Sequence, residues 1–151
     1  MRYETMFIVK PTLTQEETAA RIELIKSTLE KQGAKIDALW EMGSRQLAYK
    51  IDKFERGFYT VIYFTAEGSS IKELERIYRI NEDIIRFIVI KYAKKIEIEA
   101  WENMVKKAKG EPYKEVSFVE KERKPRKSFD FDAEKSKKEE TVESQEVENA
   151  E

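Results

Sequence analysis

Along the first 92 residues, the hydrophobic pattern switches between the two-residue period of a strand and the 3.6-residue period of a helix. The two-residue period marks residues 3–9, 35–51, 58–65 and 84–92, and the helical period marks residues 15–33 and 70–78. The implied order of elements is β-α-β-β-α-β. Right-handed crossovers place both helices on one side of a four-stranded antiparallel sheet. The sequence therefore predicts an α+β, ferredoxin-like sandwich over residues 1–95.

Both predicted helices carry signals for their ends. Thr14 with Glu17, and Ser70 with Glu73, have the spacing of a capping box at a helix N-terminus. Gly33 is typical of the position just after a helix C-terminus. We therefore expect the first helix to cover residues 15–33 and the second to begin at Ser70.

The long alternating segment at 35–51 changes phase in its middle. Its apolar residues are at even positions before Gly43 and at odd positions after it: Ile36, Ala38, Trp40 and Met42, then Leu47, Tyr49 and Ile51. One inserted residue at a glycine, a β-bulge, produces such a change, and bulges are frequent at sheet edges. We expect a bulge near Gly43-Ser44, an edge position for this strand, and a turn over residues 52–57. The segment 84–92 is apolar on both faces and is expected to be central or covered.

The segment from Arg56 to Phe64 resembles the strand with which an RNA-recognition motif stacks bases. The alternation of side chains in two predicted strands opposes that interpretation. The more hydrophobic face of this strand (Phe58, Thr60, Ile62, Phe64) is expected in the core. The other face (Tyr59, Val61, Tyr63, Thr65) suits a partly solvent-exposed surface. Thr5, Phe7 and Val9 of the first strand are likewise expected to face inward. Base stacking would need Phe58 and Phe7 to face outward, so we expect this strand to build the core.

The second face of the sheet then keeps a large apolar patch, formed by Met6, Ile8, Tyr59, Val61, Tyr63, Ile88 and Ile90. A patch of this size is not expected to stay in water. We expect a protein partner, a second copy or the C-terminal extension to cover it. The alternative is shielding by long side chains such as Arg86.

Charge divides the chain at about residue 110. Residues 1–110 carry 20 Lys and Arg against 17 Asp and Glu, whereas residues 111–151 carry 9 against 13. Within residues 96–110, the segment 97–109 has the spacing of a short helix, with Trp101, Met104, Val105 and Ala108 as its apolar stripe. Residues 111–151 are predicted to be a charged, disordered tail with a basic cluster at 121–127.

The chain contains no His and no Cys, which excludes imidazole acid–base chemistry, thiolate chemistry and Cys/His zinc sites. It has no Gly-rich phosphate loop, and the adjacent carboxylates Glu82 and Asp83 are typical of a helix end. We therefore expect neither an enzyme nor a bound cofactor, metal or small-molecule substrate. The longest apolar run, residues 84–90, is interrupted by Arg86 and is too short for a membrane span. A homo-oligomeric ferredoxin-like regulatory domain that binds a small metabolite remains the alternative.

Three stretches resemble the bacterial small-subunit ribosomal protein six family: Gly43-Ser-Arg45-Gln-Leu47-Ala48-Tyr49-Lys-Ile51, Arg2-Tyr3-Glu4 and Arg79-Ile-Asn-Glu-Asp-Ile84. The resemblance covers about residues 1–95. It departs from the family at Gln46, where a second basic residue is common, and at Lys50, which replaces a frequent Pro. The resemblance implies a cytoplasmic ribosomal protein that binds the central domain of small-subunit ribosomal RNA. It also implies a heterodimer with small-subunit ribosomal protein eighteen, a small basic protein.

RNA binding requires cations along a phosphate track, and Arg45 ranks first because it lies in the family motif. The full set of candidates for RNA contact is Arg2, Arg45, Lys53, Arg56, Arg79, Arg86, Lys91 and Lys94. The candidates for contact with a protein partner are Tyr49, Tyr59, Tyr63 and Ile88. Two alternatives stay open: Tyr49 could pack under the bulge, and Trp40 could be buried.

Overall fold

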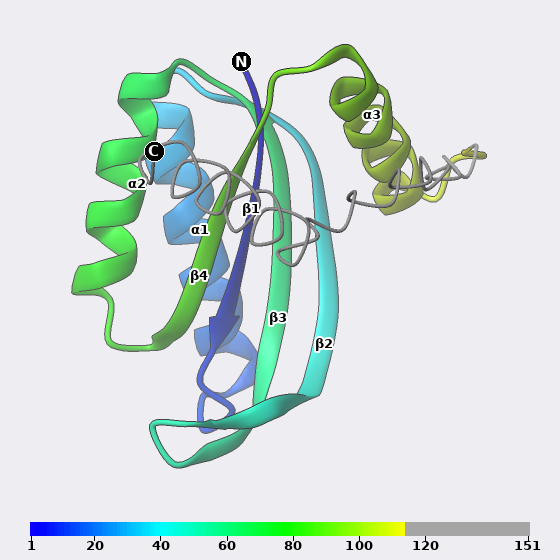
Figure 1. Ribbon diagram of the computed structural model, residues 1–151. Coiled ribbons are helices and arrows are strands. Elements are labelled where there is room, and N and C mark those ends of the chain that lie inside the picture. Colours follow the sequence, from blue (N-terminus) through cyan, green and yellow to red (C-terminus); the bar gives the residue numbers. More distant parts are fainter. Residues whose placement is uncertain (114–151) are drawn as a thin grey trace, which may run out of the picture. The chain divides into compact units, whose positions relative to one another are not determined.

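The structure, a computed structural model, describes residues 1–113. Its elements are β1 (Arg2–Val9), α1 (Gln15–Lys31), β2 (Lys35–Ile51), β3 (Phe54–Thr65), α2 (Gly68–Ile80), β4 (Ile84–Tyr92) and α3 (Lys95–Lys109). The strands form one antiparallel sheet in the order β2-β3-β1-β4. Helices α1 and α2 pack on one face and α3 on the other (Figure 1). The predicted ferredoxin-like fold is confirmed. The charged tail and its basic cluster at 121–127 lie outside the described residues.

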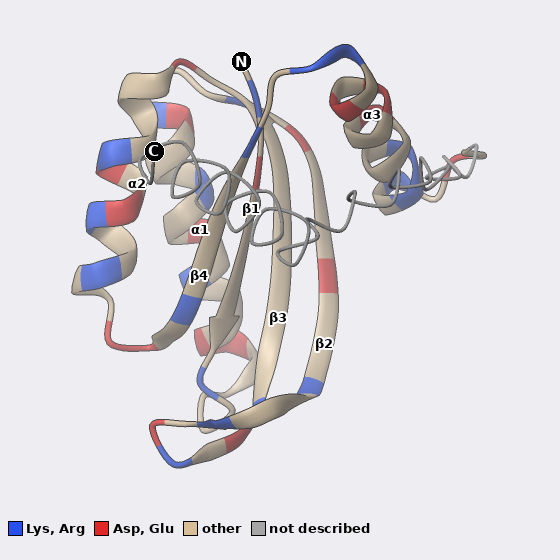
Figure 2. Cartoon of the chain, in the orientation of Figure 1, with Lys and Arg blue, Asp and Glu red and all other residues tan. Residues whose placement is uncertain are grey.

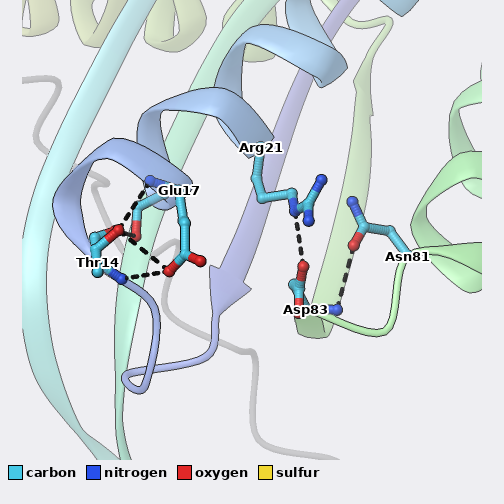
Figure 3. Close-up of polar contacts among 6 residues, drawn as sticks. Thr14, Glu17, Arg21, Asn81 and Asp83 are labelled. Carbon is cyan, nitrogen blue, oxygen red and sulfur yellow. Dashed lines mark hydrogen bonds and ion pairs between the residues drawn. The ribbon is translucent and has the colours of Figure 1, made fainter.

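The predicted capping box at the start of α1 is present (Figure 3). The hydroxyl of Thr14 accepts from the amide of Glu17 at 3.2 Å, and the Glu17 carboxylate accepts from the amide of Thr14 at 2.8 Å. One turn later, Arg21 Nε lies 2.7 Å from Asp83 Oδ2, and Asn81 Oδ1 accepts from the amide of Asp83. Asp83 therefore ties α1 to the turn before β4, a structural role in line with its assignment to a helix end.

The capping box predicted at Ser70 is wrong. Helix α2 begins at Gly68, with Glu67 as an N-cap that has no side-chain hydrogen bond. The Ser70 hydroxyl instead donates to the backbone carbonyl of Gln32, at 3.1 Å. A tertiary contact with the end of α1 thus takes the side chain that a local rule assigned to the cap.

Strand β2 is an edge strand, as predicted, and its bulge lies between Glu41 and Gly43, where Gly43 has φ +76°. Two further register shifts, between Ile36 and Ala38 and between Gln46 and Ile51, were not predicted. Because of the first, Ile36 packs with the α1–α2 layer while Ala38 packs with α3. The even-numbered residues of this segment therefore do not all share one face.

The hairpin turn between β2 and β3 is shorter than the predicted 52–57. Ile51 pairs with Phe54, so the loop contains only Asp52 and Lys53. Both have positive φ, 48° and 70°, as a two-residue type I′ hairpin requires. The hairpin therefore extends β2 and β3 well beyond the helical layer, and Figure 1 shows it at the end of the sheet opposite α3.

The predicted orientation of β3 is confirmed. Ile62 and Phe64 are fully buried in the cluster between the sheet and α1–α2, and Phe58 packs against that cluster. Val61 and Tyr63 belong to the other cluster, on the α3 side. These contacts rule out an outward-facing Phe58 and, with it, the base-stacking arrangement.

Gly57, the glycine of the Arg-Gly-Phe stretch, has a packing role. A Cβ added there would lie 2.2 Å from Ile8 Cγ2 on the neighbouring strand β1. That methyl is attached directly to the branched Cβ of Ile8, so it has little freedom to move. The glycine therefore permits close approach of the hairpin to β1.

Strand β4 lies at the second edge of the sheet, so its predicted central position is wrong. One of its faces, with Phe87 and Val89, packs on the helical layer. Ile88 and Ile90 on the other face are 47% and 38% exposed. The double-sided apolar pattern thus reflects a core face plus an uncovered face.

Helix α3 confirms the short helix predicted after the sandwich. It is joined to the sheet by a small core that contains Trp101, Val105, Ala38, Val61 and Tyr63. The indole Nε1 of Trp101 donates to the backbone carbonyl of Tyr3 at 2.9 Å, and Arg2 pairs with Glu102 at 3.1 Å. Part of the apolar face is therefore covered by the chain itself.

Candidate protein and nucleic-acid interface

Helix α3 divides the second face of the sheet into a covered and an uncovered part. The covered part lies mainly over β2 and β3. On the other side, β1 and β4 pair with Glu4 opposite Ile90, Met6 opposite Ile88 and Ile8 opposite Arg86. Ile8 is buried, and we refer to the other five of these residues, Glu4, Met6, Arg86, Ile88 and Ile90, as the open strip. It has an acidic residue at one end, a basic residue at the other and apolar side chains between.

The hairpin forms one wall of a groove at the Arg86 end of the open strip. The groove has a volume of about 420 Å³, and its apolar lining includes Met6, Ile8, Leu47, Ile51, Tyr59 and Ile88. Tyr49, at its rim, is 59% exposed. Its hydroxyl accepts a hydrogen bond from Arg86 Nη1 at 2.9 Å, and the guanidinium carbon lies 5.7 Å from the ring centroid. Tyr49 therefore does not pack under the bulge but holds the hairpin against β4.

Five of the eight candidate RNA contacts lie towards the hairpin end of the sheet: Arg45, Lys53, Arg56, Arg79 and Arg86. Arg45 is exposed beside the bulge and has no acidic partner within residues 1–113. Arg56 donates to the backbone carbonyl of Ser44 at 3.2 Å. Arg79 and Arg86 line one shallow groove together with Asp52 of the turn. Figure 2 shows basic and acidic segments mixed on the hairpin, so the hairpin end of the sheet carries several cations but is not uniformly basic.

The other three candidates lie at the opposite end of the strands. Arg2 pairs with Glu102 and stacks over the Trp101 ring at 5.6 Å. Lys94 lies 3.9 Å from Glu97, and Lys91 is exposed in the strand position opposite Tyr3. At about 3.3 Å per residue, the five positions from Arg86 to Lys91 span roughly 17 Å. The eight cations therefore form two separate groups.

The four candidate partner contacts differ in accessibility. Ile88 is exposed in the open strip, Tyr59 is half-buried in the groove and Tyr49 stands at its rim. Tyr63 is only 2% exposed, and its ring meets Trp101 edge-on, with centroids 6.4 Å apart. Tyr63 thus supports α3 and is not accessible to a partner while α3 stays docked. The apolar stripe of residues 97–109 was the sequence signal for this cover.

Trp40, whose burial the sequence left open, is half-buried beside α3, with Lys107 Nζ 5.5 Å from its ring centroid.

Sequence reasoning did not single out Glu4 as a site residue. Its Oε2 accepts a hydrogen bond from the Tyr92 hydroxyl at 2.5 Å. The pKa of Tyr63 is raised mainly by burial and also by the nearby charge of Glu4. The pKa of Tyr92 is raised mainly by burial and also by its hydrogen bond to Glu4. Both tyrosines therefore stay protonated, and Tyr92 serves as a donor to Glu4.

Within residues 1–113, no three His, Cys, Asp or Glu side chains are grouped in a way that could hold a metal ion. No helix in the same range is long and apolar enough to cross a membrane. The candidate site is an apolar strip and groove with two groups of cations.

Comparison with known proteins identifies relatives along most of the chain. The family model described as Ribosomal protein S6 matches residues 2–91. Small ribosomal subunit protein bS6 of Nitratiruptor sp. is 56% identical over 107 residues, which cover 71% of this chain and 84% of that protein. The corresponding protein of Campylobacter lari is 55% identical over 104 residues, covering 69% and 84%.

A solved structure matches as well. The crystal structure of 30S ribosomal protein S6 from Thermotoga maritima is similar with a TM-score of 0.61 and 38% identity, and the match covers 70% of this chain and 96% of that one. Helix α3 lies beyond the residues that the family model matches. The identities over more than two thirds of the chain show that it belongs to the ribosomal protein S6 family.

Proposed function

We propose that the chain is a structural component of the small ribosomal subunit that binds the central domain of small-subunit ribosomal RNA together with small-subunit ribosomal protein eighteen. Its place of action is the ribosome in the bacterial cytoplasm, and it acts by binding rather than by catalysis. The observation that carries the proposal is the uncovered apolar strip beside the cation-bearing hairpin, in a chain that belongs to the ribosomal protein S6 family.

The two surfaces have different tasks in this proposal. Ile88, Ile90 and the groove lose exposed apolar area when a protein partner packs on them, which favours a complex. The cations near the hairpin then continue a phosphate track supplied mainly by the basic partner. The chain's own contribution is modest, because residues 1–110 hold only 20 basic against 17 acidic residues. RNA binding should therefore be much tighter for the heterodimer than for the chain alone.

Arg45 is the cation with the strongest case for a direct phosphate contact. It is exposed, belongs to the family-like motif and has no acidic partner within the described residues. An arginine can bind a phosphate with two hydrogen bonds. Arg2 and Lys94 have weaker cases, because each must first leave Glu102 or Glu97.

A filter-binding titration against small-subunit RNA, with and without small-subunit ribosomal protein eighteen, tests the proposal across a salt series. Arg45→Ala should weaken binding by about tenfold and lower the salt slope by about one. Lys72→Ala is the matched control, because Lys72 is an exposed single charge on α2, behind the other sheet face. If Arg45→Ala behaves like Lys72→Ala with and without the partner, Arg45 is not a contact.

The competing function, a homo-oligomeric domain that binds a metabolite, predicts a different behaviour in solution. Light scattering of the isolated chain should show a monomer that becomes a heterodimer when the basic protein is added. A stable homodimer that ignores the basic protein would favour the regulatory function instead.

A further inference from the structure

The geometry points to Glu4 as the residue that selects a basic partner on the open strip, through an ion pair with a Lys or Arg of that partner. The partner's cation would lie beside the apolar side chains that cover Ile88 and Ile90. This inference rests on the proposed function, because it takes the occupant of the strip to be the small basic protein. It adds the chemical feature that makes the apolar surface selective.

The position of Glu4 is unusual for a carboxylate. It lies on the inner strand β1, with Tyr63 opposite it on β3 and Ile90 opposite it on β4. The side chain is half-buried. Removing a charge from water is unfavourable unless the charge is paired and hydrogen-bonded. A half-buried carboxylate between Tyr63 and Ile90 is thus unfavourable unless it gains polar partners.

The described part of the chain satisfies this carboxylate only in part. The Tyr92 hydroxyl donates to Oε2, which leaves Oε1 without a described partner. Within residues 1–113, no Lys or Arg lies within ion-pair distance of Glu4; Arg2, the neighbouring cation on the same face, is paired with Glu102. A carboxylate can accept hydrogen bonds at both oxygens. One face of Glu4 therefore remains available for an external donor.

The two ends of the strip are not equivalent in this respect. Arg86 already donates to the Tyr49 hydroxyl and lies over its ring, whereas Glu4 has no cationic partner among residues 1–113. Four residue steps along β4 separate the two ends, about 13 Å. An occupant that places a cation at the Glu4 end and apolar groups over Ile88 and Ile90 complements the strip. Basic proteins supply that combination, and an acidic occupant would meet repulsion.

Calorimetric titration of the full chain with purified small-subunit ribosomal protein eighteen tests the inference. Glu4→Gln should weaken binding by about tenfold or more, because a charge-assisted hydrogen bond is lost from a desolvated interface. Tyr92→Phe is the decisive companion. It removes the internal hydrogen bond to Glu4 but keeps the Glu4 charge, so its affinity should stay within about threefold of the unsubstituted chain. Glu99→Gln, an exposed carboxylate on α3, is the charge control and should change little.

Urea unfolding of each variant separates folding effects from binding effects. If Glu4→Gln binds as well as the unsubstituted chain while Ile88→Asp abolishes binding, the strip is the interface but Glu4 does not select the partner. If Tyr92→Phe weakens binding as much as Glu4→Gln, the effect is structural and the inference fails. If the unsubstituted chain does not bind the basic protein at all, the proposed function fails and the inference falls with it. Self-association that Glu4→Gln abolishes would assign the strip to a second copy instead.

Discussion

Replacing Trp101 by alanine should detach α3 from the sheet, and the size of the effect follows from its contacts. The side chain is only 4% exposed, and truncating a buried Trp to Ala costs about 3–5 kcal/mol. The lost contacts include the hydrogen bond to the Tyr3 carbonyl and the edge-on contact with Tyr63. We expect the free energy of unfolding to fall by about 3 kcal/mol, because α3 can leave while the remaining sandwich stays folded.

Urea unfolding followed by far-UV circular dichroism measures this loss. Trp101→Phe keeps most of the apolar area but lacks the indole N–H, so it should cost only about 1–2 kcal/mol. Glu99→Ala, on the exposed side of the same helix, should change stability by less than about 0.5 kcal/mol. A loss below about 1 kcal/mol for Trp101→Ala would refute the conclusion that α3 is a fixed layer of the fold.

Three smaller perturbations test local features of the structure. Gly57→Ala should lower the free energy of unfolding by about 1–3 kcal/mol, since the new Cβ meets Ile8 Cγ2 at 2.2 Å; an unchanged urea midpoint would contradict this packing. Lys53→Gly should raise stability by about 0.5–1 kcal/mol because Lys53 has φ 70°, and a lower thermal midpoint would argue against the two-residue turn. The pKa of Glu97 is lowered because the amides of Lys94 and Ala93 donate to its carboxylate. Its support of α3 is therefore present above the ordinary value of 4.5 and is lost as the pH falls through the lower folded value. A helix-content titration of Glu97→Gln should lack that acid transition, and an unaltered transition would show that another group causes it.

The orientation of β3 could be predicted because side-chain chemistry differs strongly between its two faces. The side chains of Phe58, Ile62 and Phe64 have no polar group, whereas those of Tyr59 and Tyr63 carry hydroxyls. The bulge at Gly43 could be predicted for a similar reason, since glycine tolerates the positive φ that the bulge requires. In both cases a local property of the residues coincides with the tertiary arrangement.

The features that sequence reasoning got wrong depend on contacts between distant segments. The register shift after Ile36 carries no glycine to signal it. Ser70 has the spacing of a cap, but its hydroxyl donates to the carbonyl of Gln32, just after α1. Tyr63 and Arg2 were chosen as surface residues, yet α3 buries the first and pairs with the second. Glu4 lay within the family-like opening, but its hydrogen-bond donor, Tyr92, is 88 positions away.

Methyl NMR of the isoleucine side chains, during titration with small-subunit ribosomal protein eighteen, tests the central claim most directly. The claim is that the sheet face left open by α3 receives the protein partner. Ile88 and Ile90 should shift or broaden, while Ile80, which is 61% exposed at the end of α2, should remain unchanged as a control. Perturbation at Ile80 and the α1–α2 surface, with Ile88 and Ile90 unaffected, would contradict the claim.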